Sequence, residues 1–553
     1  MLRIWFACCT CLVMLGVVFL TVTAALPVVP RPQTRHGDEQ TVSIQTAAAQ
    51  IDAKLAALWE ARGVVPTVTA SELEVLRRLS LALHGTIPSL EEIRAFEQDQ
   101  LPDRLDRWLV RMMSDQRFAD YLAERLARAY VGVGQDGQPF IFRRDRFLVW
   151  LSRRLAEGAP YDAIVKEMIT ARGVWTGRGE VNFLTAAFTE GEADPNELTA
   201  RTARAFLGQR IDCAQCHDHP FDHWKQHEFE GLAAFYAKLE LTPAGVVDRQ
   251  SREFRVGMLD DDPGRVVTPE VPFSPEWCGT TGAAREQLAR WITHPENARF
   301  ERAIANRMWG ILFGRPFAAD RPVDDLPDPE VDPDLQVLDL LGADFRAHGY
   351  DLRRLIRVIA ATQAFRLSST EPTGGKAAHP PHDREAVESS GEETLAENSW
   401  GVFPVVRLRP EQVIGAMLQA TNLRTIDQNS HLLVRTLRLV REGDFVNEYG
   451  DPGVEELQAR PMTIPQALLS MNGQLARELT EPNPFLSGGR ILGAASSREQ
   501  IIEVAFLVCL TRRPTRDEVT YFSSNWDWEK DRGAAMQDLL WTLFNSPEFN
   551  WNH

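Results

Sequence analysis

The sequence lacks the short motifs by which common enzyme classes are recognised. It contains no Gly-x-Ser-x-Gly elbow, no Walker loop, no His-Glu-x-x-His pair, and no Gly-x-Gly-x-x-Gly run after a predicted strand. These motifs supply a nucleophile, a phosphate cradle, a zinc pair or a dinucleotide site. Their absence leaves the sequence without an identifiable nucleophile or catalytic acid.

Positive charge is scarce relative to negative charge. The 553 residues include 60 lysines and arginines against 77 aspartates and glutamates, which gives a formal net charge of -17. No basic patch with interleaved aromatic residues interrupts this balance. Because nucleic-acid-binding surfaces depend on clustered positive charge, the composition predicts that nucleic acid is not a partner.

Long apolar runs are missing except at the N-terminus. Arg3 precedes a run from Ile4 to Ala25 that is interrupted only by three threonines. A run of about 22 residues suits either a secretory signal peptide or a single membrane anchor, and both interpretations stay open. We expect residues 1–25 to be this segment. The rest of the chain is then periplasmic or extracellular, and meets a membrane only through this segment if it is uncleaved.

Cysteine is rare, and two of the seven cysteines form the motif Cys213-x-x-Cys216-His217. This spacing is the attachment signature of c-type haem, in which the two thiols form thioethers and the histidine coordinates iron. The motif lies in the stretch Asp212–His223, which we call the Cys/His turn. The turn therefore predicts haem c at Cys213, Cys216 and His217, and favours an electron-transfer protein with a redox partner protein.

The Cys/His turn admits two other interpretations. Cys213, Cys216, His219 and His223 have the spacing of a four-ligand zinc site, which would be structural because it leaves no open position. With His217, these residues are the candidate metal ligands. A Cys213–Cys216 disulfide would also persist outside the cytoplasm. Either alternative describes an exported binding or scaffold protein whose turn is stapled by metal or by a disulfide.

The haem interpretation needs a second iron ligand and an apolar lining. The candidate ligands opposite His217 are His223, His227, Met258 and Met308. Phe206, Leu207, Phe221, Trp224 and Phe229 either line a haem cavity or pack as ordinary helix core. Pro220 breaks the chain after His219, so the turn is predicted to join a helix over 196–207 to one over 228–238.

Apolar residues recur with the helical period along most of the chain. Capping boxes at Ser71-x-x-Glu74 and Ser89-x-x-Glu92 predict two helix starts. The period disappears between Leu239 and Gly282, where 252–258 and 266–273 are predicted as short strands or extended chain, and it resumes near Arg285. We expect a mainly α, multi-helix, two-domain protein with a short irregular or β-containing linker.

The predicted boundaries follow these changes in pattern. After the N-terminal segment 1–25 they are a tether at 26–70, a first helical domain with the Cys-x-x-Cys-His motif at 71–238, an irregular linker at 239–282, and a second helical domain at 283–553. The last of these includes an insertion at 370–397, rich in Ser, Glu, Gly and Pro, that is predicted to be mobile. The acidic run between Asp324 and Asp334 offers oxygen ligands of the calcium type but lacks EF-hand spacing, which favours a solvated loop.

Several motifs resemble one family. They are Leu76–Leu81, Gly158–Asp162 and Phe206–Asp222 in the first helical region, and Asn306–Trp309, Val323–Asp325, His348–Leu352 and Leu543–Phe549 in the second. The chain resembles the exported bacterial proteins, abundant in planctomycetes, that pair the domains of unknown function fifteen-forty-nine and fifteen-fifty-three. The first domain is also labelled cytochrome c-like for its Cys-x-x-Cys-His.

The resemblance covers 71–238 and 283–551 and implies no established activity. It fails after Asp325, where Leu326–Glu330 replaces the expected Asn-Pro-Pro-Ser-His-like run. A third class of function therefore stays open beside the two above. It is an enzyme, hydrolytic or redox, that acts in the degradation of an extracellular polymer such as a polysaccharide.

Overall fold

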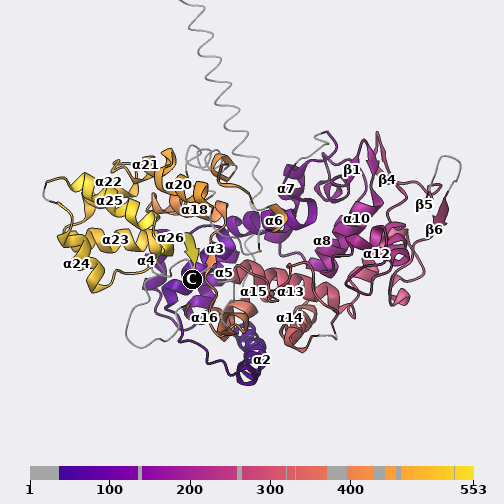
Figure 1. The fold of residues 1–553 in the computed structure, drawn as a ribbon, viewed down its shortest axis with the longest axis horizontal. Helices are drawn as coiled ribbons and strands as arrows, with labels where there is room; N and C mark the ends of the chain where they lie inside the picture. Colours follow the sequence, from indigo (N-terminus) through magenta and orange to yellow (C-terminus); the bar gives the residue numbers. More distant parts are fainter. Residues whose placement is uncertain are drawn as a thin grey trace, which may run out of the picture. The chain divides into compact units, whose positions relative to one another are not determined.

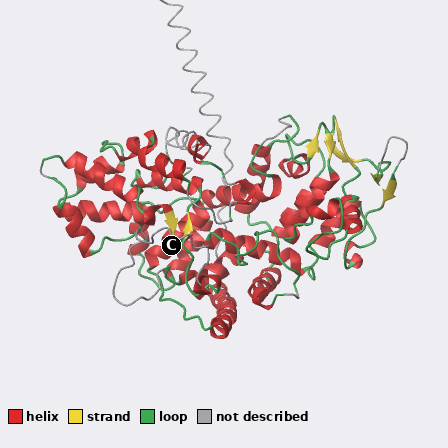
Figure 2. Ribbon diagram, in the orientation of Figure 1, coloured by secondary structure: helices red, strands yellow, loops and turns green. Residues whose placement is uncertain are grey.

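The structure, a computed structural model, describes residues 37–134, 140–257, 264–318, 320–329, 332–369, 395–427, 430, 443–446, 448–451, 453–455, 457, 463–528 and 530–553. The chain divides into two units, Met1–Ser43 and Ile44–His553. The second unit contains most of the described residues and is mainly α-helical, with short strands in two-stranded antiparallel pairs (Figure 2). The predicted mainly α fold with a β-containing linker is confirmed.

The helices up to the Cys/His turn follow the predicted apolar pattern. In chain order they are α2 (Gly37–Arg62), α3 (Glu72–His84), α4 (Leu90–Gln98), α5 (Arg104–Met113), α6 (Gln116–Val131), α7 (Arg144–Ala156), α8 (Tyr161–Thr170), α9 (Asn182–Thr185) and α10 (Pro195–Thr202). Both predicted capping boxes are present, because Ser71 caps α3 and Ser89 caps α4 reciprocally with the glutamate three residues later.

The described part of the predicted tether packs on the core from Ile44 onward. Ile44, Ile51, Leu55 and Trp59 are buried against the main hydrophobic cluster. The Trp59 indole donates a hydrogen bond of 2.7 Å to the backbone oxygen of Ser399. These apolar residues recur at helical spacing within an Ala-, Thr- and Gln-rich stretch, whose composition favours a tether at first sight. Residues 44–62 are therefore structural rather than a linker, contrary to the expectation for this part of 26–70.

Short hairpins flank the Cys/His turn and occupy the linker. β1 (Phe188–Thr189) pairs with β2 (Glu192–Ala193), β3 (Leu239–Thr242) with β4 (Gly245–Asp248), and β5 (Phe254–Val256) with β6 (Arg265–Val267). The last two hairpins fall between Leu239 and Gly282, where the helical period is absent. The expectation of short strands in this region is confirmed.

Helices resume at Ala284, as the sequence predicts. They are α12 (Ala284–Ile292), α13 (Ala298–Phe313), α14 (Gln336–Ala347), α15 (Leu352–Ala361), α16 (Gln363–Arg366), α17 (Leu395–Asn398), α18 (Pro410–Ala420), α20 (Ile464–Asn472), α21 (Gln474–Thr480), α22 (Ser487–Ala494), α23 (Arg498–Leu510), α24 (Arg516–Ser524), α25 (Arg532–Phe544) and α26 (Pro547–Asn550) (Figure 1). β7 (Val406–Arg407) pairs with β8 (Trp551–Asn552) near the end of the chain.

The hydrophobic core has two clusters. The larger one combines residues from both predicted helical regions, and at its centre α13 is buried continuously from Phe300 to Phe313. The smaller one is built mainly from α18 and α21–α25, with Leu81 and Ile87 contributed by the first region. Apolar side chains of the two family-like regions therefore pack together in one core.

Two adjacent arginines on α3 connect these clusters. Arg77 donates to the backbone oxygens of Cys509 at 3.0 Å and Phe549 at 3.1 Å. Arg78 donates to the backbone oxygens of Phe365 and Leu367 at 3.0 and 2.7 Å. Neither guanidinium has a carboxylate partner within the described residues. Burial lowers the pKa of Arg77 to about 10 and that of Arg78 to about 9.

Two predicted segments lie outside the described residues. They are the N-terminal run 1–25 and most of the insertion, 370–394. Over the part of the chain that the structure does describe, no helix has both the length and the apolar character needed to cross a membrane.

Candidate functional site

The Cys/His turn connects two helical segments, as predicted. α10 continues into a π-helical turn, η2 (Ala203–Leu207), which ends at Gly208 with φ +63°. A short 3-10 helix, η3 (Asp212–Gln215), then places Cys213, and Cys216 is the residue that follows it. The chain enters the next helix, α11 (Gln226–Ala233), beyond the turn.

The base of the turn is anchored to the loop that follows α13. The Trp224 indole is buried and donates to the side-chain oxygen of Gln209 at 3.2 Å. Gln209 in turn donates to the backbone oxygen of Leu326 at 2.6 Å, and the Leu326 amide donates to Gly208 at 2.8 Å. The turn is therefore fixed against the loop in which this chain departs from the family-like pattern.

The two thiols are exposed and unpaired. Cys213 and Cys216 form no disulfide, although Ala214 between them is fully buried. Cys216 borders an open hollow of about 700 Å³. The hollow is lined also by Asn196, Gln215, Gln226, Phe229, Glu230, Val256, Gly257, Gly264 and Arg265. Both sulfurs are thus accessible to a reagent or a cofactor from solvent.

The His217 ring is oriented by a single backbone contact. Its Nδ1 lies 2.7 Å from the backbone oxygen of Asp218. A carbonyl oxygen can only accept, so Nδ1 is the donor, and Nε2 carries the lone pair when the ring is neutral. Nε2 has no partner within the described residues. Histidines that ligate metals are oriented in this way, with one ring nitrogen donating to a carbonyl and the other available.

The other two histidines of the turn are engaged differently. His219 accepts a hydrogen bond at Nδ1 from the Phe221 amide at 3.3 Å. His223 Nδ1 lies 2.7 Å from Asp222 Oδ1 and 3.6 Å from Asp328 Oδ2. In the described parts of the chain, no three His, Cys, Asp or Glu side chains gather closely enough to hold a metal ion. The four predicted zinc ligands are therefore not brought into one set in this arrangement.

Most of the predicted apolar lining belongs to the helix core. Phe206, Leu207 and Trp224 are buried in the main cluster, and η2 packs against α13. Phe229 is also buried but borders the hollow, whereas Phe221 is 93% exposed. Ordinary packing therefore accounts for three of the five predicted lining residues.

The candidate second iron ligands lie in different environments. Met308 is buried within α13, and His223 and His227 are exposed. Met258 lies outside the described residues. Of the two exposed histidines, His223 has its Nδ1 bound to the neighbouring aspartate.

The acidic run after α13 is held by arginines. Asp324 pairs with Arg210 at 2.8 Å, and Asp328 pairs with Arg299. Asp334 pairs with Arg62 of α2. Guanidinium groups compete for the carboxylate oxygens that a calcium ion would need, so these three described pairs favour an ion-paired connection.

The exposed thiols and the imidazole of the turn have the chemistry to hold a covalently attached haem. Both thiols are reachable, and Nε2 of the imidazole has no partner among the described residues, but of these three residues only Cys216 lines the neighbouring hollow, which Phe229 and Val256 also line. Cys213 and Cys216 would hold the group, and His217 would coordinate its iron. The arrangement of each of these side chains follows from η3 and the turn that succeeds it.

The sequence gives no signal for a second pocket, which has a volume of about 570 Å³. Its lining comes from the end of α3, from α4 and α5, from the loop after α18 and from α22. Segments separated by some 300 residues meet there, so no local spacing could have predicted it. The pocket is described further below.

These features define a mainly helical protein that presents a Cys-x-x-Cys-His turn between two helices. Residues 50–240 match the family PSCyt2, described as a protein of unknown function (DUF1549), and residues 284–436 match PSD1, described as a protein of unknown function (DUF1553). The chain belongs to the proteins that pair these two domains, which confirms the two domains named in the predicted resemblance. No curated protein and no solved structure matches the chain.

Proposed function

We propose that the protein is an exported electron-transfer protein that carries one c-type haem on the Cys/His turn. In this proposal Cys213 and Cys216 form the thioether links and His217 is the proximal iron ligand. A bound haem supplies reversible one-electron chemistry at a potential that the protein tunes through its ligands.

The orientation of His217 is the observation that carries the proposal. Its Nδ1–H donates to the Asp218 carbonyl at 2.7 Å, which leaves Nε2 as the free coordinating atom. This contact orients the ring before any ligand arrives. The imidazole is exposed, so an iron centre can approach it without rearrangement of the core.

The state of the thiols supports the same function. A structural disulfide would pair Cys213 with Cys216, but the two are unpaired and exposed in this arrangement. The proposed export also favours a haem-binding function, because bacterial attachment of haem to Cys-x-x-Cys-His takes place outside the cytoplasm. The apolar run from Ile4 to Ala25 is the basis for the proposed periplasmic or extracellular location.

A redox partner protein would approach the exposed side of the turn. Phe221 is 93% exposed there and is followed in the chain by the exposed Asp222. An exposed aromatic residue beside negative charge suits a short-lived contact with a partner that carries positive charge. Electron transfer needs no larger interface, since weak redox encounters bury little surface.

The test is to produce the full chain together with a bacterial haem-attachment system and to measure the mass of the denatured protein. We expect an added mass of one haem and a Soret band that survives denaturation. The double variant Cys213→Ser/Cys216→Ser should lose both signals, whereas the matched control Cys278→Ser, which removes a buried cysteine outside the motif, should keep them. Unmodified protein that instead contains zinc would favour the scaffold alternative and overturn the proposal.

A further inference from the structure

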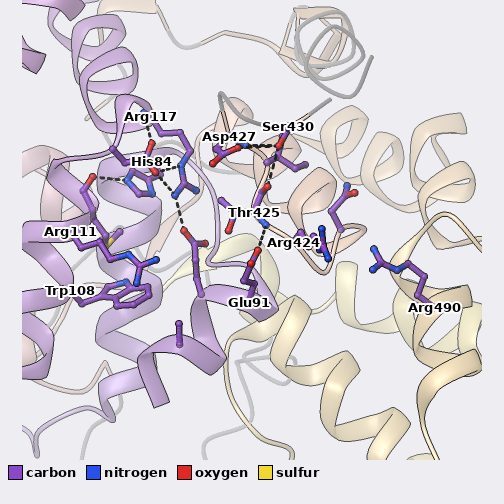
Figure 3. Close-up of a pocket in the computed structure, with 16 residues that line it drawn as sticks. His84, Glu91, Trp108, Arg111, Arg117, Arg424, Thr425, Asp427, Ser430 and Arg490 are labelled. Atoms are coloured by element: carbon purple, nitrogen blue, oxygen red, sulfur yellow. Dashed lines mark hydrogen bonds and ion pairs between the residues drawn. The ribbon is translucent and has the colours of Figure 1, made fainter. Parts of the chain in front are cut away.

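A second pocket is lined by segments that precede and follow the Cys/His turn in the sequence. Its volume of about 570 Å³ is lined, among other residues, by Glu91 and Glu92 of α4, Trp108 and Arg111 of α5, Asn422, Arg424–Asp427 and Ser430 after α18, and Arg490 of α22 (Figure 3). None of these residues belongs to the Cys/His turn or contacts it in any interaction described above. The pocket is therefore a separate candidate site.

The floor of the pocket contains an ion-paired arginine and a neutral histidine. Arg117 pairs with Glu92 at 2.7 Å and with Asp115 at 2.9 Å. His84 is 3% exposed and its Nε2 lies 3.1 Å from the Met112 carbonyl. Burial lowers the pKa of His84 to about 4, so the ring is neutral at physiological pH. These groups fix the floor and leave no net positive charge to attract a ligand.

Three arginines at the rim behave differently. Arg111, Arg424 and Arg490 are exposed, and none has a carboxylate within ion-pairing distance among the described residues. Arg111 lies over the Trp108 ring, with its guanidinium carbon 4.8 Å from the centroid. That contact orients the guanidinium without neutralising it. Figure 3 shows Arg111 and Trp108 on one side of the pocket and Arg424 and Arg490 on the other.

These three arginines differ from several others on this acidic chain. Acidic residues outnumber basic ones by 77 to 60, and Arg125, Arg285 and Arg357 each pair with a carboxylate. Three guanidinium groups therefore line one hollow without an ion pair among the described residues, although carboxylates line it as well. A planar guanidinium matches the geometry of carboxylate, phosphate and sulfate groups, to which it donates two parallel hydrogen bonds.

The loop that carries Arg424 is fixed by its own hydrogen bonds. Gln419 donates to the backbone oxygens of Asn422 and Arg424 at 3.1 and 2.9 Å. The Thr425 amide donates to the Glu91 carboxylate at 3.4 Å, which ties the loop to α4. Arg424 is therefore presented from a pinned backbone, and ligand binding does not have to pay for ordering the loop.

Acceptor groups lie between the two sets of arginines. The carboxylate of Glu91 and the side chains of Thr425 and Asp427 line the same hollow. Carboxylates repel an anion but accept hydrogen bonds from hydroxyl groups. A bare inorganic anion would meet these acceptors without compensation, whereas an anion with hydroxyl groups nearby satisfies both kinds of partner.

We propose that this pocket binds a hydroxylated organic anion, in which an oxyanion group is attached to a carbon skeleton that bears hydroxyl groups. Arg424 and Arg490, which lie on the same side of the pocket, bind the oxyanion, Arg111 adds positive charge from the other side, and Glu91 with its neighbours accepts from the hydroxyl groups. The oxyanion is a carboxylate or a phosphate ester, since both present paired oxygens to a guanidinium.

The test uses the full chain and isothermal titration with four probes: gluconate, glucose 6-phosphate, glucose and inorganic phosphate. We expect gluconate, glucose 6-phosphate or both to bind, and the one that binds more tightly identifies the oxyanion. Glucose should not bind, and inorganic phosphate should bind at least about tenfold more weakly than the better hydroxylated anion. Arg424→Gln and Arg490→Gln should each weaken that affinity by about tenfold or more.

The matched control is Arg532→Gln, which removes an exposed arginine of α25 outside the pocket that has no ion pair within the described residues. It should leave binding unchanged. Equal loss of affinity in Arg532→Gln would mean that only long-range charge attracts the probes, and would overturn the proposal. Equal binding of inorganic phosphate and the hydroxylated anions, binding of glucose, or binding of no probe would overturn it as well. Circular dichroism of each variant confirms that the exposed substitutions leave the fold intact.

Discussion

Replacing Arg78 with methionine should destabilise the protein strongly, although this residue has no carboxylate partner within the described residues and lies far from any predicted site. Its guanidinium is fully buried and donates to the backbone oxygens of Phe365, Leu367 and His553. It also lies over the Phe403 ring, 3.7 Å from the centroid. One side chain thus holds three chain segments that are distant in sequence.

The expected loss follows from the contacts. The methionine leaves the Phe365 and Leu367 carbonyls buried without this donor, which costs about 1–3 kcal/mol for each group. Loss of the contact with Phe403 adds about 1 kcal/mol. Removal of a buried charge offsets part of this cost, because the cation itself is desolvated in the fold. We expect a net loss of about 3 kcal/mol in the free energy of unfolding.

Urea unfolding followed by tryptophan fluorescence measures this loss. Arg78→Lys should lose almost as much, because one ammonium cannot replace the fork of donors that reaches separate carbonyls. The matched control is Arg516→Met on exposed α24, which should shift stability by less than about 0.5 kcal/mol. A change in Arg78→Met as small as that of the control would refute the inference that Arg78 holds α3 to these three chain segments.

Three further predictions concern single groups. Burial raises the pKa of Glu301 to about 7 even though Arg346 is its ion-pair partner. The free energy of unfolding should therefore fall as the pH rises from about 4.5, the pKa of this carboxyl in the unfolded chain, through 7. Glu301→Gln should abolish that slope and gain about 3 kcal/mol at pH 8, as measured in thermal or urea unfolding. Glu411 is buried 2.8 Å from Arg125, and Glu411→Ala should cost about 3–5 kcal/mol in urea unfolding, because it leaves arginine charge uncompensated; a loss below about 1 kcal/mol contradicts this. In protein made without haem attachment, a thiol reagent should modify Cys213 and Cys216 at once, but the buried Cys278 and Cys509 only after unfolding. Immediate labelling of these four cysteines would show that the described burial is wrong.

Much of the helical architecture could be predicted because its signals are local. Ser71 and Ser89 specify helix starts through three-residue capping boxes, and both boxes form. The loss of the helical period after Leu239 likewise marks the β-containing linker. Such signals depend on neighbours within one or two turns, and a single sequence contains them in full.

The role of α2 was harder to predict for a physical reason. Ile44, Ile51 and Leu55 are widely spaced among alanines and polar residues, so the stretch has low overall hydrophobicity. Its burial depends on the surface that the rest of the chain provides. The sequence shows the apolar stripe but not the partner that covers it.

The candidate site was predictable only in its local motif. The spacing of Cys213, Cys216 and His217 is a local pattern, and the structure presents all three on one turn. The anchoring of that turn to Leu326 is not local, because it joins residues more than 100 positions apart. The arginine-rimmed pocket is still less accessible to sequence reasoning, since Arg111 and Arg490 belong to helices that only tertiary packing brings together.

The mass of the purified, denatured protein tests the central claim most directly. Full-length chain produced with a haem-attachment system should carry the mass of one haem, and that mass should disappear when Cys213 and Cys216 are both replaced by serine. Protein of unmodified mass, obtained while a known c-type cytochrome is matured in the same cells, would contradict the account.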